Sequence, residues 1–207
     1  MPRSSAKLRE SRRQEIVSAC EELYKDKGFN EITLLDISHA TILTRTALYK
    51  YYQTKEEIFL DLLKLEHERW SEALTHILND NKVLSEEEFV VQIAKTLDDR
   101  LQLLRLMAMN VFELEAKSRY ERVVEFKISM GKPMKLIRDI LDKFITDMSD
   151  EQKEQFVYAF FPLIFGIYPY SVINERSFQA MEEAGIEFHY YTVYELCCNG
   201  IRALLHR

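Results

Sequence analysis

The spacing of hydrophobic residues predicts a chain built almost entirely from helices. Near the N-terminus, apolar residues recur in steps of three and four, as they do on one face of a helix. This first stripe consists of Ile16, Ala19, Cys20, Leu23 and Tyr24. Further helical segments are expected at about 85–97, 100–115, 118–146, 150–174 and 187–206. Only 5 Gly and 4 Pro occur in 207 residues, which disfavours a loop-rich β sandwich.

Two short helices joined by a tight turn are predicted between residues 33 and 52. Thr33 opens the first helix, with Asp36 placed three residues later as in a capping box. Thr44 is expected to cap the second helix, in which Leu48 and Tyr52 lie four residues apart and face inward. The outer side of the second helix is then polar, basic and aromatic. This combination is typical of a helix-turn-helix motif.

A long helix is predicted to follow, beginning at Thr54 with Glu57 as its capping partner. Lys55 stands in the first turn of this helix. A cation there opposes the helix dipole, so stability alone would not favour it. A helix N-terminus that also presents a lysine suits a phosphate group. We therefore expect Lys55 to contact phosphate.

The net charge of -6 conceals two parts of opposite sign. Residues 1–55 carry 10 Lys+Arg and 7 Asp+Glu, whereas residues 56–207 carry 18 and 27. A basic N-terminal part on an acidic body suggests a partner that is a polyanion. The segment "RSSAKLRESRR", which starts at Arg3, is either an arm that adds phosphate or minor-groove contacts or a solvated tail.

The remaining composition argues against several classes of protein. Three cysteines without metal-like spacing disfavour a disulfide framework and favour a reducing cytoplasm. The basic N-terminus is not followed by the apolar segment of a signal peptide. The five histidines lack paired-ligand spacing, and no Gly-rich phosphate loop, nucleophile elbow or zinc motif is present. We therefore expect no metal, no cofactor and no enzymatic activity.

The stretch "ITLLDISHATILTRTALYKYYQTKEEIF" resembles the DNA-binding signature of TetR-type (TetR/AcrR) transcriptional regulators. The matching residues are Thr33, Asp36, Ile37, Leu43, Thr44, Leu48, Tyr49, Tyr51, Lys55, Glu56 and Ile58. Upstream, "IVSACEELYKDKGFNEIT" is similar to the first helix of that family and its Gly-Phe turn. The resemblance implies an all-α fold. Its N-terminal three-helix helix-turn-helix DNA-binding domain would span 9–69, and a helical C-terminal ligand-binding and dimerisation domain would span 70–207.

Three positions depart from the family pattern. Ser38 stands where the family usually has a small residue, Ile42 stands where it usually has the glycine of the turn, and Thr46 stands where a glycine is common early in the second helix. A β-branched residue is poorly suited to a positive φ. The turn at Ile42 therefore either takes another shape or carries strain.

The resemblance also assigns roles to residues of the motif. It implies that Thr33, Thr44, Tyr49 and Lys55 contact phosphates, and that Arg45, Thr46 and Lys50 reach base edges. Tyr51 belongs to the same expected DNA-binding set. The chemistry agrees, because hydroxyl groups suit phosphates and Arg or Lys suits guanine in the major groove. The alternative for each residue is a solvated surface side chain.

The most apolar stretch runs from Gln155 to Asn174 and contains no charge. Its length is that of a membrane span, but Pro162, Pro169 and the lack of a basic flank favour a buried core helix. In TetR-type proteins the last two long helices pair across the dimer axis. The residues expected at such an interface are Phe156, Phe160, Leu163, Tyr191, Tyr194 and Leu196.

In the same family, an inducer pocket lies among the middle helices. Methionine and aromatic side chains would give an adaptable apolar lining, although such residues also form ordinary cores. The residues expected to line the pocket are Trp70, Leu74, Met107, Phe112, Tyr120, Phe126 and Met130.

The sequence therefore predicts a cytoplasmic, homodimeric transcriptional repressor. It would bind a double-stranded DNA operator and be released by a small apolar or amphipathic effector whose identity the sequence does not specify. One alternative is a DNA-binding or architectural protein of the same fold that responds to no ligand. Another is a helical ligand-binding or enzymatic protein with a vestigial DNA-binding head, and a third is a membrane-associated protein.

Overall fold

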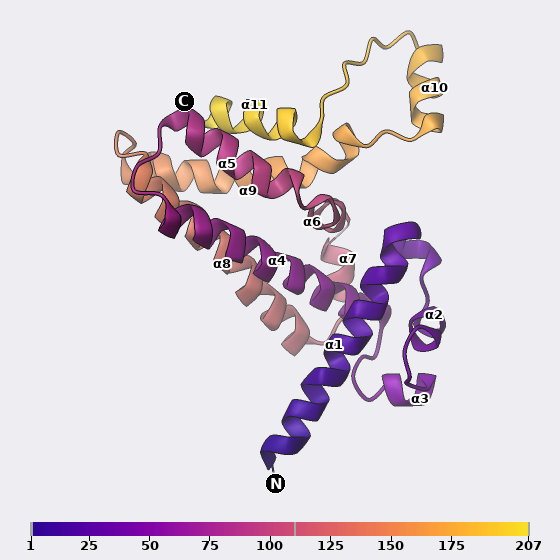
Figure 1. The fold of residues 1–207 in the computed structure, drawn as a ribbon. Helices are drawn as coiled ribbons and strands as arrows, with labels where there is room; N and C mark the ends of the chain where they lie inside the picture. Colours follow the sequence, from indigo (N-terminus) through magenta and orange to yellow (C-terminus); the bar gives the residue numbers. More distant parts are fainter. Residues whose placement is uncertain (1, 110, 207) are drawn as a thin grey trace. The chain divides into compact units, whose positions relative to one another are not determined.

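The computed structural model describes residues 2–109 and 111–206, with side chains from residue 6 onward, and this described part contains helices and turns but no strand (Figure 1). The chain forms two compact units. The first comprises Met1–Glu66 and Asn110–Ser129, and the second comprises His67–Met109 and Met130–Arg207. Residues 110–129 thus accompany the N-terminal unit. The predicted domain boundary at residue 69 stays a prediction.

The first unit combines the long helix α1 with several short helices around a buried centre. Its elements are α1 (Pro2–Asp26), the 3-10 helix η1 (Phe29–Glu31), α2 (Leu34–His39), α3 (Arg45–Leu48), the beginning of α4 (Lys55–Asp80), α7 (Val111–Ala116) and the beginning of α8 (Tyr120–Phe144). Leu48 and Tyr52 are fully buried, which confirms the inward face predicted for this region. The ring of Phe59 packs edge-on against Tyr24 and Phe29, with centroids 5.2 and 4.8 Å apart.

The second unit has an aromatic core. It contains the rest of α4 and α8, together with α5 (Glu86–Asp98), α6 (Leu101–Met107), α9 (Asp150–Ser171), α10 (Glu175–Glu183) and α11 (Val193–Leu205). Helix α11 packs against α5 and α9. Trp70 lies against Phe161, with ring centroids 5.8 Å apart. Helix α10 buries none of its residues and stands away from α5, α9 and α11 (Figure 1).

Three predicted helices differ from the structure. The second helix of the motif, predicted to include Tyr52, ends at Leu48. The segment expected at 100–115 is divided, because α6 ends at Met107 and α7 begins at Val111. The last helix begins at Val193 rather than near residue 187. Its start is fixed by a capping box, in which the Glu195 amide donates to Thr192 Oγ1 (3.2 Å) and the Thr192 amide donates to the Glu195 carboxylate (2.8 Å).

The apolar stretch forms most of α9, a single helix that continues through Pro162 and Pro169. Within the described residues, no individual helix has both the length and the apolar character needed to cross a membrane. Helices α9 and α10 satisfy those criteria only when taken together, and they are bent by 83° at the break between them. One side of α9 is buried in the second unit, including Phe156, Phe160 and Ile164.

Candidate functional site

The two short helices of the first unit begin at the predicted caps. Thr33 Oγ1 accepts the Asp36 amide, and the Asp36 carboxylate accepts the Thr33 amide, which completes the capping box of α2. The Thr33 hydroxyl and amide both donate to the Asp36 carboxylate, and these two hydrogen bonds hold the pKa of Asp36 below its ordinary value. At α3, Thr44 Oγ1 accepts the Ala47 amide at 3.2 Å. Both helices therefore start where local side-chain chemistry places them.

The turn between α2 and α3 is held by side chains rather than by a left-handed residue. Ser38 is buried, and its hydroxyl donates to the Leu43 carbonyl at 3.0 Å. The Thr41 hydroxyl accepts the Leu43 amide at 3.2 Å, and Glu15 accepts the Ile42 amide at 3.2 Å. Ile42 has a negative φ, as does every other non-glycine residue of the described chain. Of the two possibilities left open by the sequence, the turn takes another shape.

The outer face of this motif is polar and basic. Six of the predicted DNA-contacting residues are exposed: Thr33, Thr44, Arg45, Thr46, Tyr49 and Lys50. The guanidinium group of Arg45 lies over the Tyr49 ring, 5.7 Å from its centroid, and donates to the Tyr49 hydroxyl at 3.2 Å. This contact orders a long side chain before any ligand binds. Tyr51 is half-buried, so it contributes less to this face.

Lys55 has a structural role that its position in the sequence did not predict. Its Nζ donates to the carbonyl groups of Phe29 (2.7 Å) and Ile32 (3.0 Å), and lies 4.1 Å from the Phe29 ring centroid. The expectation that stability alone would not select a lysine here is wrong, because these contacts fix η1 to the start of α4. Its phosphate contact stays a prediction.

Behind the motif lies a set of charged residues that local sequence patterns did not reveal. Arg119 binds the buried carboxylate of Glu57 through Nε (2.6 Å) and Nη2 (2.8 Å). Arg13 binds Asp61 (2.7 Å) and Glu125 (2.9 Å). The partners are 62, 48 and 112 residues apart in the chain. No helical periodicity or motif spacing connects positions so distant.

Some residues of the basic N-terminal segment also form ion pairs within the first unit. Helix α1 begins at Pro2, so the segment is helical. Arg12 binds Glu15 at 2.6 Å, and Arg13 is directed inward as described above. Lys7 and Arg9 are exposed, whereas the side chain of Arg3 lies outside the described residues.

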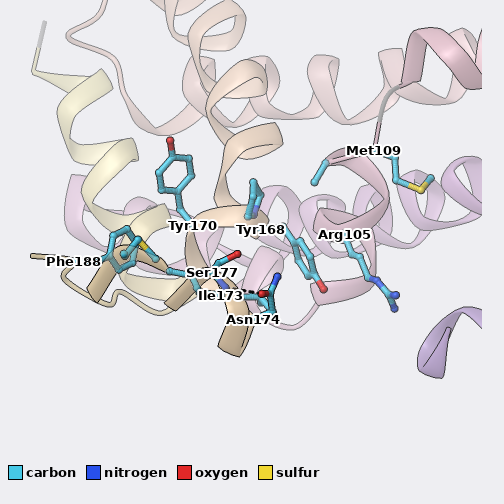
Figure 2. Close-up of a pocket in the computed structure, with 12 residues that line it drawn as sticks. Arg105, Met109, Tyr168, Tyr170, Ile173, Asn174, Ser177 and Phe188 are labelled. Atoms are coloured by element: carbon cyan, nitrogen blue, oxygen red, sulfur yellow. Dashed lines mark hydrogen bonds between the residues drawn. The ribbon is translucent and has the colours of Figure 1, made fainter. Parts of the chain in front are cut away.

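A hollow of about 510 Å³ lies in the second unit, beside the end of α6, the end of α9 and α10 (Figure 2). Its apolar lining includes Tyr168, Val172, Ile173, Met181 and Phe188. Polar groups are contributed by Arg105, Asn174 and Ser177. The Asn174 side chain caps α10 by accepting the Ser177 amide at 2.9 Å, the dashed contact in Figure 2.

Two family matches cover nearly the whole chain. Residues 16–62 match the bacterial regulatory proteins of the tetR family. Residues 65–206 match the tetracyclin repressor-like C-terminal domain, and this match alone spans more than half of the chain. The chain belongs to the TetR family. Members of this family are bacterial regulatory proteins, and such regulators are not enzymes.

Two HTH-type transcriptional regulators match in sequence over a limited segment. The HTH-type transcriptional regulator HbdR of Aromatoleum sp. (strain CIB) is 32% identical over 77 residues, which is 34% of this chain and 34% of that protein. QacR of Staphylococcus aureus (strain Mu50 / ATCC 700699), also an HTH-type transcriptional regulator, is 30% identical over 60 residues, 29% of this chain and 32% of QacR. The chain thus aligns with about a third of each relative's length.

Solved TetR-type structures share the fold over nearly the full length. Thermus thermophilus FadR, a transcriptional repressor in complex with lauroyl-CoA, superposes with a TM-score of 0.61 at 18% identity, covering 93% of each chain. The fatty acid degradation regulator FadR of Bacillus halodurans gives 0.60 at 13% identity, covering 93% of this chain and 94% of that one. These similarities confirm the all-α fold with an N-terminal helix-turn-helix domain and a helical C-terminal domain.

The residues predicted to line the TetR effector pocket lie elsewhere than in the hollow of Figure 2. Trp70, Leu74 and Met107 are fully buried in the second unit, where the Trp70 indole N–H donates to Thr96 Oγ1 at 2.9 Å. The other four divide between burial and exposure: Phe126 is buried, Met130 is half-buried, and Phe112 and Tyr120 are 83% and 79% exposed. None of the seven lines this hollow. Their role in ligand binding stays a prediction.

Two of the predicted interface residues are corrected by the structure. Phe156 and Phe160 stack on each other inside the second unit, 5.7 Å between centroids, and both are buried. They face the core because the buried side of α9 repeats every three or four residues through these positions. Leu163, Tyr194 and Leu196 are half-buried, and Tyr191 is exposed.

The remaining polar candidates lack the arrangement of a metal site. Among the described residues, no cluster of three or more His, Cys, Asp or Glu side chains is arranged to hold an ion. Cys20, Cys197 and Cys198 are buried free thiols.

Proposed function

We propose that this TetR-family protein is a homodimeric cytoplasmic repressor. Its α2–turn–α3 face would contact an operator, and an amphipathic ligand bound in the second unit would release it. The observation that carries this proposal is the exposed face of α3. Arg45 and Thr46 project from it, and Lys50 is exposed in the turn that follows it, while Leu48 and Tyr52 anchor it from behind.

The chemistry of this face fits double-stranded DNA. Arg45 and Lys50 can donate to guanine in the major groove, and Thr46 can contact a base edge. Thr33, Thr44 and Tyr49 carry hydroxyl groups near the edges of the motif, where phosphates are expected. Lys55 remains a candidate phosphate contact. In a complex with DNA, its Nζ would have to replace one of its two carbonyl acceptors with a phosphate oxygen.

DNA binding is tested by selecting duplexes from a random-sequence pool with the wild-type protein. A dimer of two such motifs should enrich a palindrome whose half-sites are about 10 base pairs apart or a multiple of that spacing. Recovery of one unpaired half-site would contradict the dimer. Failure to enrich any sequence would contradict the sequence-specific role.

The proposed dimer surface is the outward seam of α9 and α11. The two helices touch at Gly200, where an added Cβ would overlap with Leu163 Cδ2. Both residues are only half-buried, so this seam lies at the surface of the unit. Beside it, Tyr158 and Pro162 are exposed. An apolar surface of this kind is what an isologous helical interface requires.

Gly166 offers a direct test of this surface. An added Cβ at Gly166 meets nothing within 4 Å in the single chain. We expect Gly166→Arg to leave the fold intact but to convert the dimer into a monomer, as measured by analytical ultracentrifugation. The matched control is Gly131→Arg on α8, where an added Cβ is equally unobstructed. A dimer that persists in Gly166→Arg would contradict this interface.

The effector is proposed to bind in the hollow of Figure 2. Its volume of about 510 Å³ falls in the range of small-molecule sites, roughly 300–1,000 Å³. The lining is apolar, with Arg105 as a cationic group. Such a site suits a molecule with an apolar chain and an anionic end. The lauroyl-CoA bound to the T. thermophilus neighbour belongs to this chemical class.

Laurate and lauroyl-CoA are suitable probes of this site. We expect binding, measured by calorimetry, to weaken when Met181→Trp fills the hollow and to remain unchanged in Met148→Trp, which lies outside it. By linkage, a ligand that releases the protein must bind the DNA-bound form more weakly by the same factor. If the ligand binds Met181→Trp as tightly as it binds the wild-type protein, its site lies outside the hollow. Unchanged affinity for the selected duplex would favour a regulator that no such ligand controls.

A further inference from the structure

We propose that Arg119 and Arg122 are positioning residues that orient the recognition helix α3 through the carbonyl group of Tyr51. Arg119 Nη2 donates to this oxygen at 3.1 Å, and Arg122 Nη2 donates to it at 3.4 Å. Tyr51 lies three residues beyond the end of α3 at Leu48. The two arginines therefore fix the point at which the chain leaves the helix. The inference rests on the proposed contact of α3 with DNA.

Arg119 is itself held by the carboxylate of Glu57, which lies in the first turn of α4. Its Nε and Nη2 form a fork around Glu57, and its backbone amide also donates to Glu57 Oε1 at 3.1 Å. Glu57 accepts the Gln53 amide at 2.8 Å. Burial alone would raise the pKa of Glu57, but the hydrogen bonds from Arg119 and Gln53 keep it below its ordinary value. The carboxylate therefore remains charged and ties Gln53, α4 and Arg119 together.

Arg122 holds the next residue as well. Its guanidinium group lies 5.5 Å from the centroid of the Tyr52 ring and donates to Glu125 at 3.0 Å. The Tyr52 hydroxyl donates to Asp61, which also binds Arg13. Arg122 and Tyr52 are buried. The carbonyl of Tyr51 and the side chain of Tyr52 are thus fixed by neighbouring parts of one hydrogen-bonded network.

Helix α3 depends on such supports because it is short. Its four residues, Arg45–Leu48, form little more than one turn. At its start, the chain is held by the Ser38 hydroxyl on the Leu43 carbonyl. Beyond its end, the chain is held by Arg119 and Arg122, which both donate to the Tyr51 carbonyl. Base-edge hydrogen bonds tolerate only a few tenths of an ångström around about 2.9 Å, so a displaced α3 should lose base contacts before phosphate contacts.

The guanidinium group is required for this role, and a positive charge alone is insufficient. Arg119 serves Glu57 and the Tyr51 carbonyl at once through a planar set of donors. A lysine at this position would keep the charge beside Glu57 but would lack the rigid fork. Arg119→Lys should therefore keep a positive charge beside the buried Glu57 carboxylate but lose the hydrogen bond that positions the Tyr51 carbonyl. The variant thus distinguishes the two roles of Arg119.

The test compares Arg119→Lys with Arg138→Lys. The control residue Arg138 has similar side-chain exposure, 30% against 34% for Arg119, and binds Asp142 and Asp150 in the second unit. Affinities are measured for the duplex selected by the wild-type protein and for a random-sequence duplex. We expect Arg119→Lys to weaken the selected duplex by about tenfold, the loss of roughly one base contact. Binding to the random duplex should change less than about twofold, and Arg138→Lys should change neither.

Hydrogen exchange supplies a readout that does not require DNA. In Arg119→Lys, the amides of residues 45–53 should exchange faster than in the wild type, while those of α5 remain unchanged. If Arg119→Lys does not fold, Arg122→Lys is measured in the same way. Unchanged hydrogen exchange in Arg119→Lys, or an equal loss of affinity for the selected and the random duplex, would overturn the positioning role. If the wild-type protein selects no duplex while exchange still changes, the proposed DNA-contacting function fails and the support of α3 stands.

Discussion

The interiors of the two units are stabilised by different kinds of contact. In the first unit, charged side chains such as Arg13, Arg119 and Glu57 reach across the fold and fix individual carbonyl groups and carboxylates. In the second, aromatic rings such as Trp70 and Phe160 fill a core between longer helices. Short helices bury too little apolar surface to set their own orientation, whereas directional hydrogen bonds can do so. A unit that must present α3 in one orientation therefore depends on its polar network.

The largest expected effect tests the apolar side of this contrast. Trp70→Ala should lower the free energy of unfolding by about 3–5 kcal/mol, because a buried indole and its bond to Thr96 are lost. Phe112→Ala, at an exposed aromatic position, should change it by less than about 0.5 kcal/mol. Denaturant titration of both variants gives the comparison. Similar losses in the two variants would contradict the assignment of Trp70 to the core.

A buried histidine makes the second unit sensitive to acid. Burial lowers the pKa of His67 from 6.5 to about 4. As the pH falls from 6.5 towards 4, the unfolded chain binds a proton that the folded chain does not, so stability decreases. The loss should approach about 3 kcal/mol. His67→Gln should flatten this dependence in denaturant titrations between pH 7 and 4.5, and the exposed control His76→Gln should not.

The two lysines of the motif separate support from recognition. Lys55→Met should lower the free energy of unfolding by about 1–2 kcal/mol, because two hydrogen bonds to carbonyl groups are removed. Lys50→Met should change it by less than about 0.5 kcal/mol. Thermal and denaturant unfolding measure both. If the two substitutions have the same small effect, Lys55 is not a structural anchor.

The smallest effect concerns the turn. Ile42 is 78% exposed and has a negative φ, so Ile42→Gly should destabilise the protein by about 0.5–1 kcal/mol through a more flexible unfolded chain. A strained turn would instead be relieved by glycine. Stabilisation of the variant in denaturant titration would therefore show that the turn carries strain.

Local patterns predicted the helix-turn-helix motif well. The cap at Thr33 and the inward direction of Leu48 depend on residues three or four apart, so sequence spacing contains the necessary information. The support of the turn by Ser38 and Thr41 required the three-dimensional path of the chain. The partners of Lys55 and Arg119 were unpredictable for the same reason, since they lie 23–26 and 62 residues away.

Residue type was a poorer guide in the second unit. Trp70 and Phe160 fill the core, whereas Met181 and Phe188 line the hollow, although all four are large apolar residues. A methionine or aromatic side chain is equally suited to a core, a ligand site or an interface. The packing of whole helices decides among these roles, and the sequence does not encode that packing locally.

The most direct test of the central claim is the affinity of Arg45→Ala for the duplex selected by the wild-type protein, measured across a salt series. If α3 reads bases, Arg45→Ala should lose about 1–3 kcal/mol on that duplex and discriminate less at one base position. Its binding to random-sequence DNA should fall far less. Wild-type affinity and selectivity in Arg45→Ala would contradict the assignment of α3 as the helix that reads DNA.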